Sequence, residues 1–191
     1  KDRKISTYLR LTSKRIDQTH GDFQGSDEAL EIRRRQVIKG AYRIIDRSNQ
    51  PGYSLGDNVV NILACGAILP EAIKASEDLY QEGVYANVIN ITGPGPLYQE
   101  FQYSVSSKLT GKRSESYLKK LMPESSLGVP VVTVVDGHPH SLSWVGAALE
   151  TKVLPLGVSK YGQSGTPEEL YVEYGIDSVN IMNASFEILD L

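Results

Sequence analysis

The chain has 191 residues, of which 40% are hydrophobic and 23% are charged, and its formal net charge is −3. That length is enough for one domain with a buried core, and the charge gives no overall basic surface of the kind that nucleic acid requires. No apolar run is long enough to span a bilayer, so we expect neither nucleic acid nor a membrane as a partner. The single Cys65 and the lack of a signal-peptide pattern favour a cytoplasmic location.

The first 38 residues are predicted to connect this domain to a preceding one. Residues 5–13 alternate and are rich in β-branched and aromatic types, which predicts a strand close to a start that lacks methionine. We therefore expect a chain cut from a longer one. Residues 14–24 are polar and contain glycine, as a linker does. A helix can begin at Ser26 or Asp27, and its three arginines at 33–35 form a solvated basic face or, alternatively, an anionic contact.

A regular alternation of strands and helices begins near residue 41, with a short strand. Residues 58–66 are a nearly continuous apolar run, which is typical of a strand buried on both faces of a parallel sheet. A helix follows, with Pro70 suited to its first turn and Gly83 just past its end. Residues 84–91 are the next predicted strand. One face of the helix is expected to be buried, with Ala72, Ala75, Ser76, Leu79 and Tyr80.

The segment "TGPGPL" at residues 92–97 is predicted to be a turn. It is rich in glycine but lacks the G-x-G-x-x-G spacing, and Pro94 and Pro96 remove two backbone donors that would hold a phosphate. Residues 101–127 are polar and indicate no clear element apart from a short helix near 117–121. A second buried strand is predicted at residues 129–136.

The last third of the sequence completes the alternation. A capping box of Thr166 and Glu169, with Pro167 at the first helical position and Gly175 after the end, predicts a well-defined helix. Strands alternating with helices favour a three-layer α/β/α sandwich around a mostly parallel sheet. A helix, a strand and a final helix are also predicted, at residues 141–150, 152–158 and 177–191.

Two of the three histidines, His138 and His140, flank Pro139 directly after the strand at residues 129–136. Open α/β sheets usually bind ligands beyond the carboxyl ends of their strands, which makes this segment a candidate site. A zinc site would need three or four ligands. The chain offers one cysteine and no His-x-x-x-His pair, although Asp136 could contribute.

Three interpretations of the two histidines stay open. In the first they belong to a structural turn, with Gly137 in the turn and Ser141 or Ser143 as the cap of the following helix. In the second they contact a ligand or an interface. In the third they bind a metal together with Asp136.

Five segments, in this order and at this spacing, resemble the C-terminal domain of the transketolase superfamily. They are "KGAYRIID", "VNILACGAILPEAIKASEDLYQEGVYANVINI", "SYLKKLMP", "VVTVVDGHPHSLSWVG" and "LGVSKYGQSGTPEELYVEYGID". The resemblance implies a five-stranded mixed sheet whose first strand is an antiparallel edge. It also implies three segments: residues 1–13 as the last strand of a preceding pyrimidine-binding domain, residues 14–38 as a connector with a helix, and residues 39–191 as the C-terminal domain.

Within this superfamily of thiamine-diphosphate enzymes, "YLRLTSKRIDQ" and "DGHPHSLSW" look closest to the single-chain, homodimeric pyruvate dehydrogenase decarboxylating component. Transketolases proper are next in similarity. They usually have Ser-Arg-Gln after the first of these strands, where an arginine grips the sugar phosphate. The corresponding residues here are Thr12, Ser13, Lys14 and Arg15.

The resemblance implies that thiamine diphosphate and Mg²⁺ in the complete enzyme lie between other domains of two subunits. We therefore expect no catalytic, cofactor-binding or metal-binding residue in this chain, and no activity from the chain alone. Its expected partners are the other domains of the enzyme and a second subunit of a homodimer. Candidate residues of an interface or ligand loop are Asp136, His138, His140 and Tyr161.

Two rival functions remain. One is a free-standing α/β module that binds a small ligand, with His138, His140 and the "TGPGP" segment as its walls. The other is a metal-dependent hydrolase centred on His138, His140 and Asp136. The assembly function predicts an exposed apolar patch, the binding module predicts a ligand-dependent rise in melting temperature, and the hydrolase predicts stoichiometric zinc.

Overall fold

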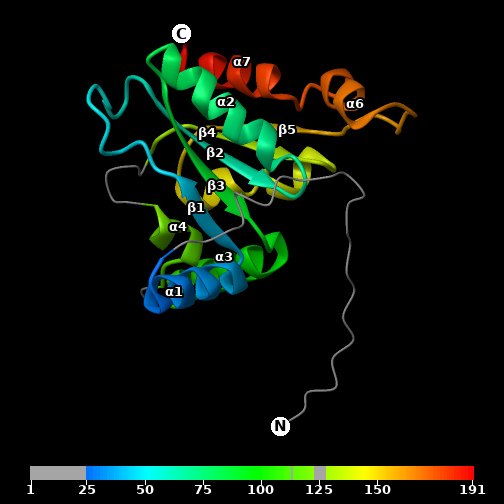
Figure 1. The fold of residues 1–191 in the computed structure, drawn as a ribbon. Coiled ribbons are helices and arrows are strands. Elements are labelled where there is room, and N and C mark those ends of the chain that lie inside the picture. Colours follow the sequence, from blue (N-terminus) through cyan, green and yellow to red (C-terminus); the bar gives the residue numbers. More distant parts are fainter. Residues whose placement is uncertain (1–24, 113, 123–127) are drawn as a thin grey trace.

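The computed structural model describes residues 25–112, 114–122 and 128–191 (Figure 1). The strand predicted at residues 5–13 and the polar linker at 14–24 lie outside the described residues. The helix expected after them is α1 (Asp27–Lys39), with the Ser26 hydroxyl as its N-cap. Gly40, at φ 108°, ends α1 in a left-handed conformation that glycine adopts most easily.

A five-stranded mixed sheet forms the centre of the molecule, as predicted, with the order β1-β3-β2-β4-β5. The first strand runs antiparallel to its neighbour at one edge, and the other four strands are parallel to one another. The strands are β1 (Ala41–Ile45), β2 (Val59–Cys65), β3 (Tyr85–Ile91), β4 (Val131–Val135) and β5 (Val153–Gly157).

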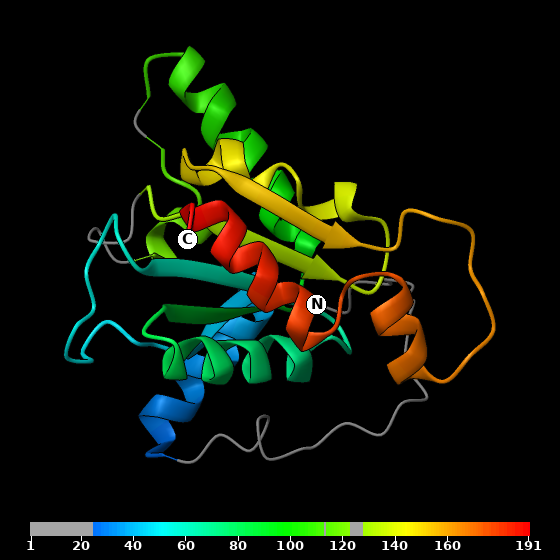
Figure 2. The same ribbon diagram turned by 90° about the horizontal axis from the view of Figure 1, so that it is seen from above.

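Helices cover both faces of the sheet, which gives the predicted three layers (Figures 1 and 2). On one face, α2 (Leu69–Gln81) and α7 (Ser178–Leu189) enclose a core that includes Ile62 of β2, and α6 (Pro167–Glu173) adds Tyr171 to it. On the other face, α3 (Pro94–Leu109), α4 (Tyr117–Leu121) and α5 (Val145–Leu149) enclose a core that includes Leu63. Within the described ranges, no helix has the length and apolar character to cross a membrane.

The central strand and its crossover helix agree with the sequence pattern. Residues Val59 to Ala64 of β2 are all buried, because helices lie on both faces of this strand. In α2 the predicted face is buried at Ala72, Ala75, Ser76 and Leu79, whereas Tyr80 is only half-buried. The Ser76 hydroxyl donates a hydrogen bond to the Ala86 carbonyl of β3 (2.7 Å), which joins this helix directly to the sheet.

The prediction of a turn at "TGPGPL" is wrong, because the 16-residue helix α3 begins within it, at Pro94. A proline is tolerated there since the first N–H groups of a helix have no partner inside the helix. Gly93 precedes the helix, and its Cα lies close to Gly40: a Cβ on Gly93 would be 3.3 Å from the Gly40 Cα. The amides of Thr92 and Gly93 donate to the Gly40 carbonyl (2.9 and 3.0 Å) and anchor the start of α3 at the sheet.

The edge strand β1 has side-chain donors on two of its carbonyls. The Tyr117 hydroxyl donates to the Ala41 carbonyl (3.0 Å), and the Arg33 guanidinium donates to the Arg43 carbonyl (2.7 Å) while lying 4.6 Å from the centre of the Tyr42 ring. One of the three arginines of α1 is therefore structural. The other two flank Glu31 in exposed ion pairs, as in the solvated interpretation.

Candidate functional site

The parallel strands β2 to β5 all end at the same edge of the sheet. After β2 the chain crosses to α2 on one face, whereas after β4 it continues into elements on the opposite face. A crevice at such a switch point is where open α/β sheets usually hold ligands. Two segments flank the end of β2 here: Thr92 to Pro94 after β3, and Asp136 to His138 after β4.

The two histidines lie at the start of a short 3-10 helix, η2 (Pro139–Leu142), between β4 and α5, and His140 is within that helix. His138 is its N-cap, and its ring Nδ1 accepts a hydrogen bond from the backbone N–H of His140 (3.2 Å). His138 therefore has a structural role in the turn after β4. The helix predicted at residues 141–150 is split into η2 and α5.

The capping role predicted for Ser141 or Ser143 is wrong. The Ser141 hydroxyl donates to the His138 carbonyl (2.6 Å) and the Ser143 hydroxyl donates to the Pro139 carbonyl (3.2 Å), so both brace η2 from within. Trp144 occupies the N-cap of α5 without a side-chain cap. Sequence alone favoured serine as the cap, because the extra helical turn before α5 has no separate signal in the sequence.

A metal interpretation finds no support in the described residues. The ring centres of His138 and His140 are 6.2 Å apart. Among the residues that the structure describes, no group of three histidine, cysteine, aspartate or glutamate side chains could hold a metal ion. The hydrolase would need such a group, so it is not supported by this part of the chain.

A cavity of about 590 Å³ lies between the start of α3 and the η2–α5 segment, and we call it the aromatic pocket. His140 lines it, whereas His138 does not. The structure thus brings His140 and the "TGPGP" segment together around one space, although they are more than forty residues apart in the sequence. The lining residues are Pro94, Gly95, Tyr98, His140, Ser141, Ser143 and Trp144.

Three aromatic side chains stand at this pocket or directly behind it. The rings of Tyr98 and Trp144 meet edge to face, with centres 5.5 Å apart, and Phe101 stacks on Trp144 at 5.7 Å. The Trp144 indole N–H donates to the Ser141 carbonyl (3.0 Å), which fixes the ring. Sequence reasoning missed Tyr98 and Trp144. Their signal was the i, i+3 spacing of Tyr98 and Phe101 on a helix that was not recognised.

The remaining candidate residues lie elsewhere. Asp136 is half-buried. It lines neither the aromatic pocket nor a second hollow that lies between α3 and α4. Burial raises the pKa of Tyr171, and the negative charge of Asp136 raises it further. Tyr161 is 95% exposed. Its carbonyl accepts from the Tyr174 hydroxyl (3.1 Å), and its segment, between β5 and α6, stands away from the sheet in Figure 2. The four candidates therefore do not form one site.

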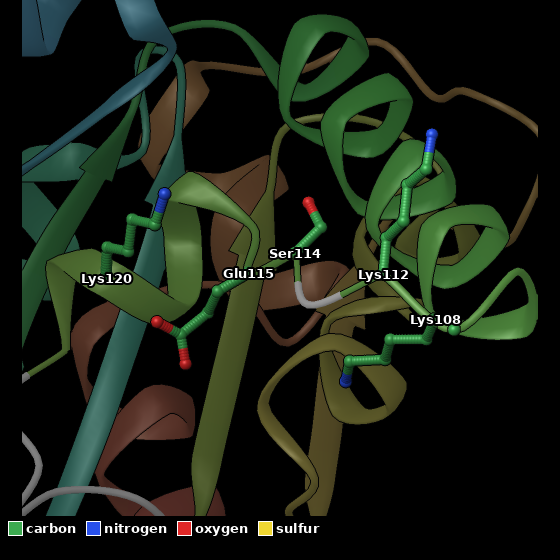
Figure 3. Close-up of a pocket in the computed structure, with 6 residues that line it drawn as sticks. Lys108, Lys112, Ser114, Glu115 and Lys120 are labelled. Atoms are coloured by element: carbon green, nitrogen blue, oxygen red, sulfur yellow. The ribbon is translucent and has the colours of Figure 1, made fainter.

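A second hollow, of about 750 Å³, lies between the end of α3 and α4 and is rich in lysine (Figure 3). The figure shows the ammonium groups of Lys108, Lys112 and Lys120 pointing in different directions. Lys108 also lies 3.8 Å from Glu150, and Glu115 adds a negative charge to the lining. Because these cations do not converge, this hollow lacks the geometry of an anion site.

Residues 40–177, more than half of the chain, match the family described as the transketolase-like TK C-terminal domain. The chain belongs to this family. Among the relatives of this transketolase C-terminal domain is a protein of Methanocaldococcus jannaschii named as a transketolase C-terminal section. It is 26% identical over 132 residues, which cover 67% of this chain and 36% of the relative. The chloroplastic transketolase of spinach, Spinacia oleracea, is 26% identical over 186 residues, which cover 96% of this chain and 20% of that enzyme.

Solved structures of transketolases share the fold. A transketolase from Leishmania mexicana matches 82% of this chain and 19% of its own, with a TM-score of 0.54 and 22% identity. A split-gene transketolase, titled an inactive beta4 tetramer, matches 80% of this chain and 43% of its own, with a TM-score of 0.50 and 20% identity. The chain thus spans between a fifth and two fifths of the length of these transketolase proteins, at an identity to the structures that shows the fold alone.

Proposed function

We propose that this chain is the C-terminal assembly domain of a thiamine-diphosphate-dependent, transketolase-like enzyme, and that it supplies no catalytic, cofactor-binding or metal-binding residue itself. Its partners would be the other domains of the enzyme and a second subunit. Thiamine diphosphate and Mg²⁺ would be held by those other domains. The observation that supports an assembly role is the apolar surface of α1 and α3.

Both helices lie on the same side of the sheet, the lower side in Figure 1, and both expose large apolar side chains. None of the 13 residues of α1 is buried, and Ile32 and Ile38 are 52% and 69% exposed. On α3, Tyr103 is 67% and Leu109 is 84% exposed. Large exposed apolar side chains of this kind can mark a surface that another protein covers. We define these four residues as the α1/α3 surface.

The relatives support this proposal in two ways. The spinach and Leishmania transketolases are several times as long as the matched region, so the equivalent domain in them has other protein to contact. The split-gene transketolase forms a tetramer and is inactive by its title, which is the behaviour that we propose for this chain by itself.

The first test measures the association of the chain. We expect it to self-associate in sedimentation velocity runs, and Ile38→Glu or Leu109→Glu to shift it toward the monomer, because a buried charge opposes an apolar contact. Val172→Glu is the matched control, since Val172 is 61% exposed on α6, away from this surface. Isothermal titration with thiamine diphosphate and Mg²⁺ should show no binding to the chain alone.

A chain that is monomeric at every concentration would contradict the assembly role. So would equal effects of Val172→Glu and Leu109→Glu, because the association would then not depend on the α1/α3 surface. Tight binding of thiamine diphosphate by the chain alone would contradict the proposal that other domains of the enzyme hold this cofactor.

The reaction of the complete enzyme has two candidates. The relatives reported above are transketolases, which favours transfer of a ketol group between sugar phosphates. The pyruvate dehydrogenase-like alternative rests on the segments "YLRLTSKRIDQ" and "DGHPHSLSW", with residues 12–15 reading Thr-Ser-Lys-Arg where transketolases have Ser-Arg-Gln. The first of these segments lies outside the described part of the chain. Assaying the complete enzyme for ketol transfer and for pyruvate decarboxylation would separate the two, since each proposal expects only one of these activities.

A further inference from the structure

We propose that the aromatic pocket binds an uncharged heteroaromatic ring of the nucleobase type, against the rings of Tyr98 and Trp144 and the imidazole of His140. This binding is additional to the assembly role and does not depend on it. The pocket volume of about 590 Å³ lies within the range of small-molecule sites, which is roughly 300–1,000 Å³.

The lining determines the chemistry of the ligand. Among the residues that the structure describes, no lysine, arginine, aspartate or glutamate lines the pocket, so they offer no counter-charge to a strongly charged ligand. The rings of Tyr98 and Trp144 offer flat apolar surface, and stacking on aromatic side chains is sequence-tolerant because every base has a π-face. A planar, neutral ring therefore matches this lining better than an ionic metabolite.

Polar groups around the rings can pair with both donors and acceptors of such a ligand. The hydroxyls of Ser141 and Ser143 already donate to backbone carbonyls, so their oxygens remain able to accept. The Tyr98 hydroxyl accepts from the Gln102 amide (2.8 Å) and can donate its own proton. Gly95 is at the second position of α3, where a backbone N–H has no partner within the helix. A nucleobase carries hydrogen-bond donors and acceptors along one edge, so it can pair with these hydroxyl groups and with the Gly95 N–H.

Both walls are held rigidly before any ligand arrives. One wall is fixed by the Trp144 indole bond to the Ser141 carbonyl and by the packing of Phe101 on Trp144. The other wall begins where the Thr92 and Gly93 amides bond to the Gly40 carbonyl. A site whose side chains are already in place avoids part of the entropic cost of binding.

Trp144 makes the experiment direct, because it is the only tryptophan of the chain. Adenosine and uridine would be titrated into the purified protein while the tryptophan fluorescence is followed, with AMP as a charged comparison. We expect saturable quenching by at least one of the two nucleosides. AMP should bind no more tightly than adenosine, since neither lysine nor arginine is among the described residues that line the pocket.

Matched variants locate the binding. Tyr98→Ala should weaken the nucleoside affinity about tenfold, which is the usual size of a lost base-stacking contact. Tyr103→Ala, on the same helix but outside the pocket, should leave the affinity unchanged. His140→Ala should weaken binding, whereas His138→Asn should not, because asparagine can also cap η2 and residue 138 does not line the pocket.

Three results would overturn the proposal. The first is quenching that never saturates, or no quenching by either nucleoside. The second is an equal loss of affinity in Tyr98→Ala and Tyr103→Ala, which would place the binding elsewhere. The third is AMP binding at least tenfold more tightly than adenosine, which would mean a site for phosphate rather than for a neutral ring. Self-association of the chain, which tests the assembly role, is measured separately and is unaffected by any of these results.

Discussion

At the scale of single residues, one glycine, Gly157, allows η2 to lie close to the sheet. Gly157 ends β5, and a Cβ at this position would lie 2.6 Å from the Gly137 carbonyl oxygen and 2.8 Å from the Pro139 nitrogen. These neighbours are backbone atoms and cannot swing aside. Gly157 is therefore required for the close approach of β5 to η2, and so for the place of His140 at the aromatic pocket.

Because β5 and η2 approach so closely, a single methyl group added at residue 157 should destabilise the fold. Gly157→Ala should lower the free energy of unfolding by about 1–3 kcal/mol, the usual cost of overpacking a well-packed site. Gly162→Ala is the control, because a Cβ there meets nothing within 4 Å. Urea unfolding followed by circular dichroism measures both variants. Equal stability of Gly157→Ala and the parent chain would contradict the packing described here.

At the scale of the elements, the sequence predicted those strands and helices whose signal lies within their own residues. The apolar run of β2 and the capping box of Thr166 and Glu169 at α6 are present as expected. The helix α3 was missed because it buries only Leu97, Ser104 and Ser107, which leaves no apolar stripe to recognise. The aromatic pocket could not be predicted without α3, since Tyr98 and Trp144 meet only through the packing of α3 beside α5.

The capping box also makes α6 sensitive to acid. Hydrogen bonds from the Thr166 backbone N–H and hydroxyl hold the pKa of Glu169 below its usual 4.5. Because the folded pKa is lower than the unfolded one, the carboxylate stabilises the fold above pH 4.5, and this contribution is lost as the pH falls through the folded pKa.

Glu169→Gln isolates this titration, because glutamine keeps a capping oxygen without the charge. The variant should have a lower urea midpoint than the parent chain at about pH 7, and the difference should shrink toward zero at about pH 3. A difference that is the same at both pH values would show that the carboxylate charge does not contribute. Thr166→Ala, which removes the other half of the box, should lower the midpoint at both pH values.

At the scale of the whole molecule, the buried core and the exposed apolar side chains lie in different parts of the structure. The core on the α2 and α7 side includes Ile62 and Ile181, both fully buried, whereas α1 contributes no buried residue at all. The sequence predicted the sheet and its layers. It also indicated that α1 is exposed, because seven of its 13 residues are charged, whereas α7 has one charged residue among 12.

Substitution in the core should therefore cost far more than substitution on an exposed helix. Ile62→Ala in the central strand should lower the free energy of unfolding by about 2–5 kcal/mol. Val172→Ala, at a 61% exposed position, should change it by less than about 0.5 kcal/mol. Chemical denaturation measures both. Similar losses from the two variants would mean that β2 is not the centre of the folded core.

The side chains that occupy the carbonyls of β1 have a consequence for how copies of this protein can join. An incoming strand would have to displace the Tyr117 hydroxyl from the Ala41 carbonyl and the Arg33 guanidinium from the Arg43 carbonyl before it could pair there. An edge strand whose backbone N–H and C=O groups are unpaired can pair with a strand of another copy, and this pairing leads to aggregation. With this border occupied, two copies of the protein are not expected to join their sheets through β1, and contacts on this side of the molecule are expected to be made by helices instead.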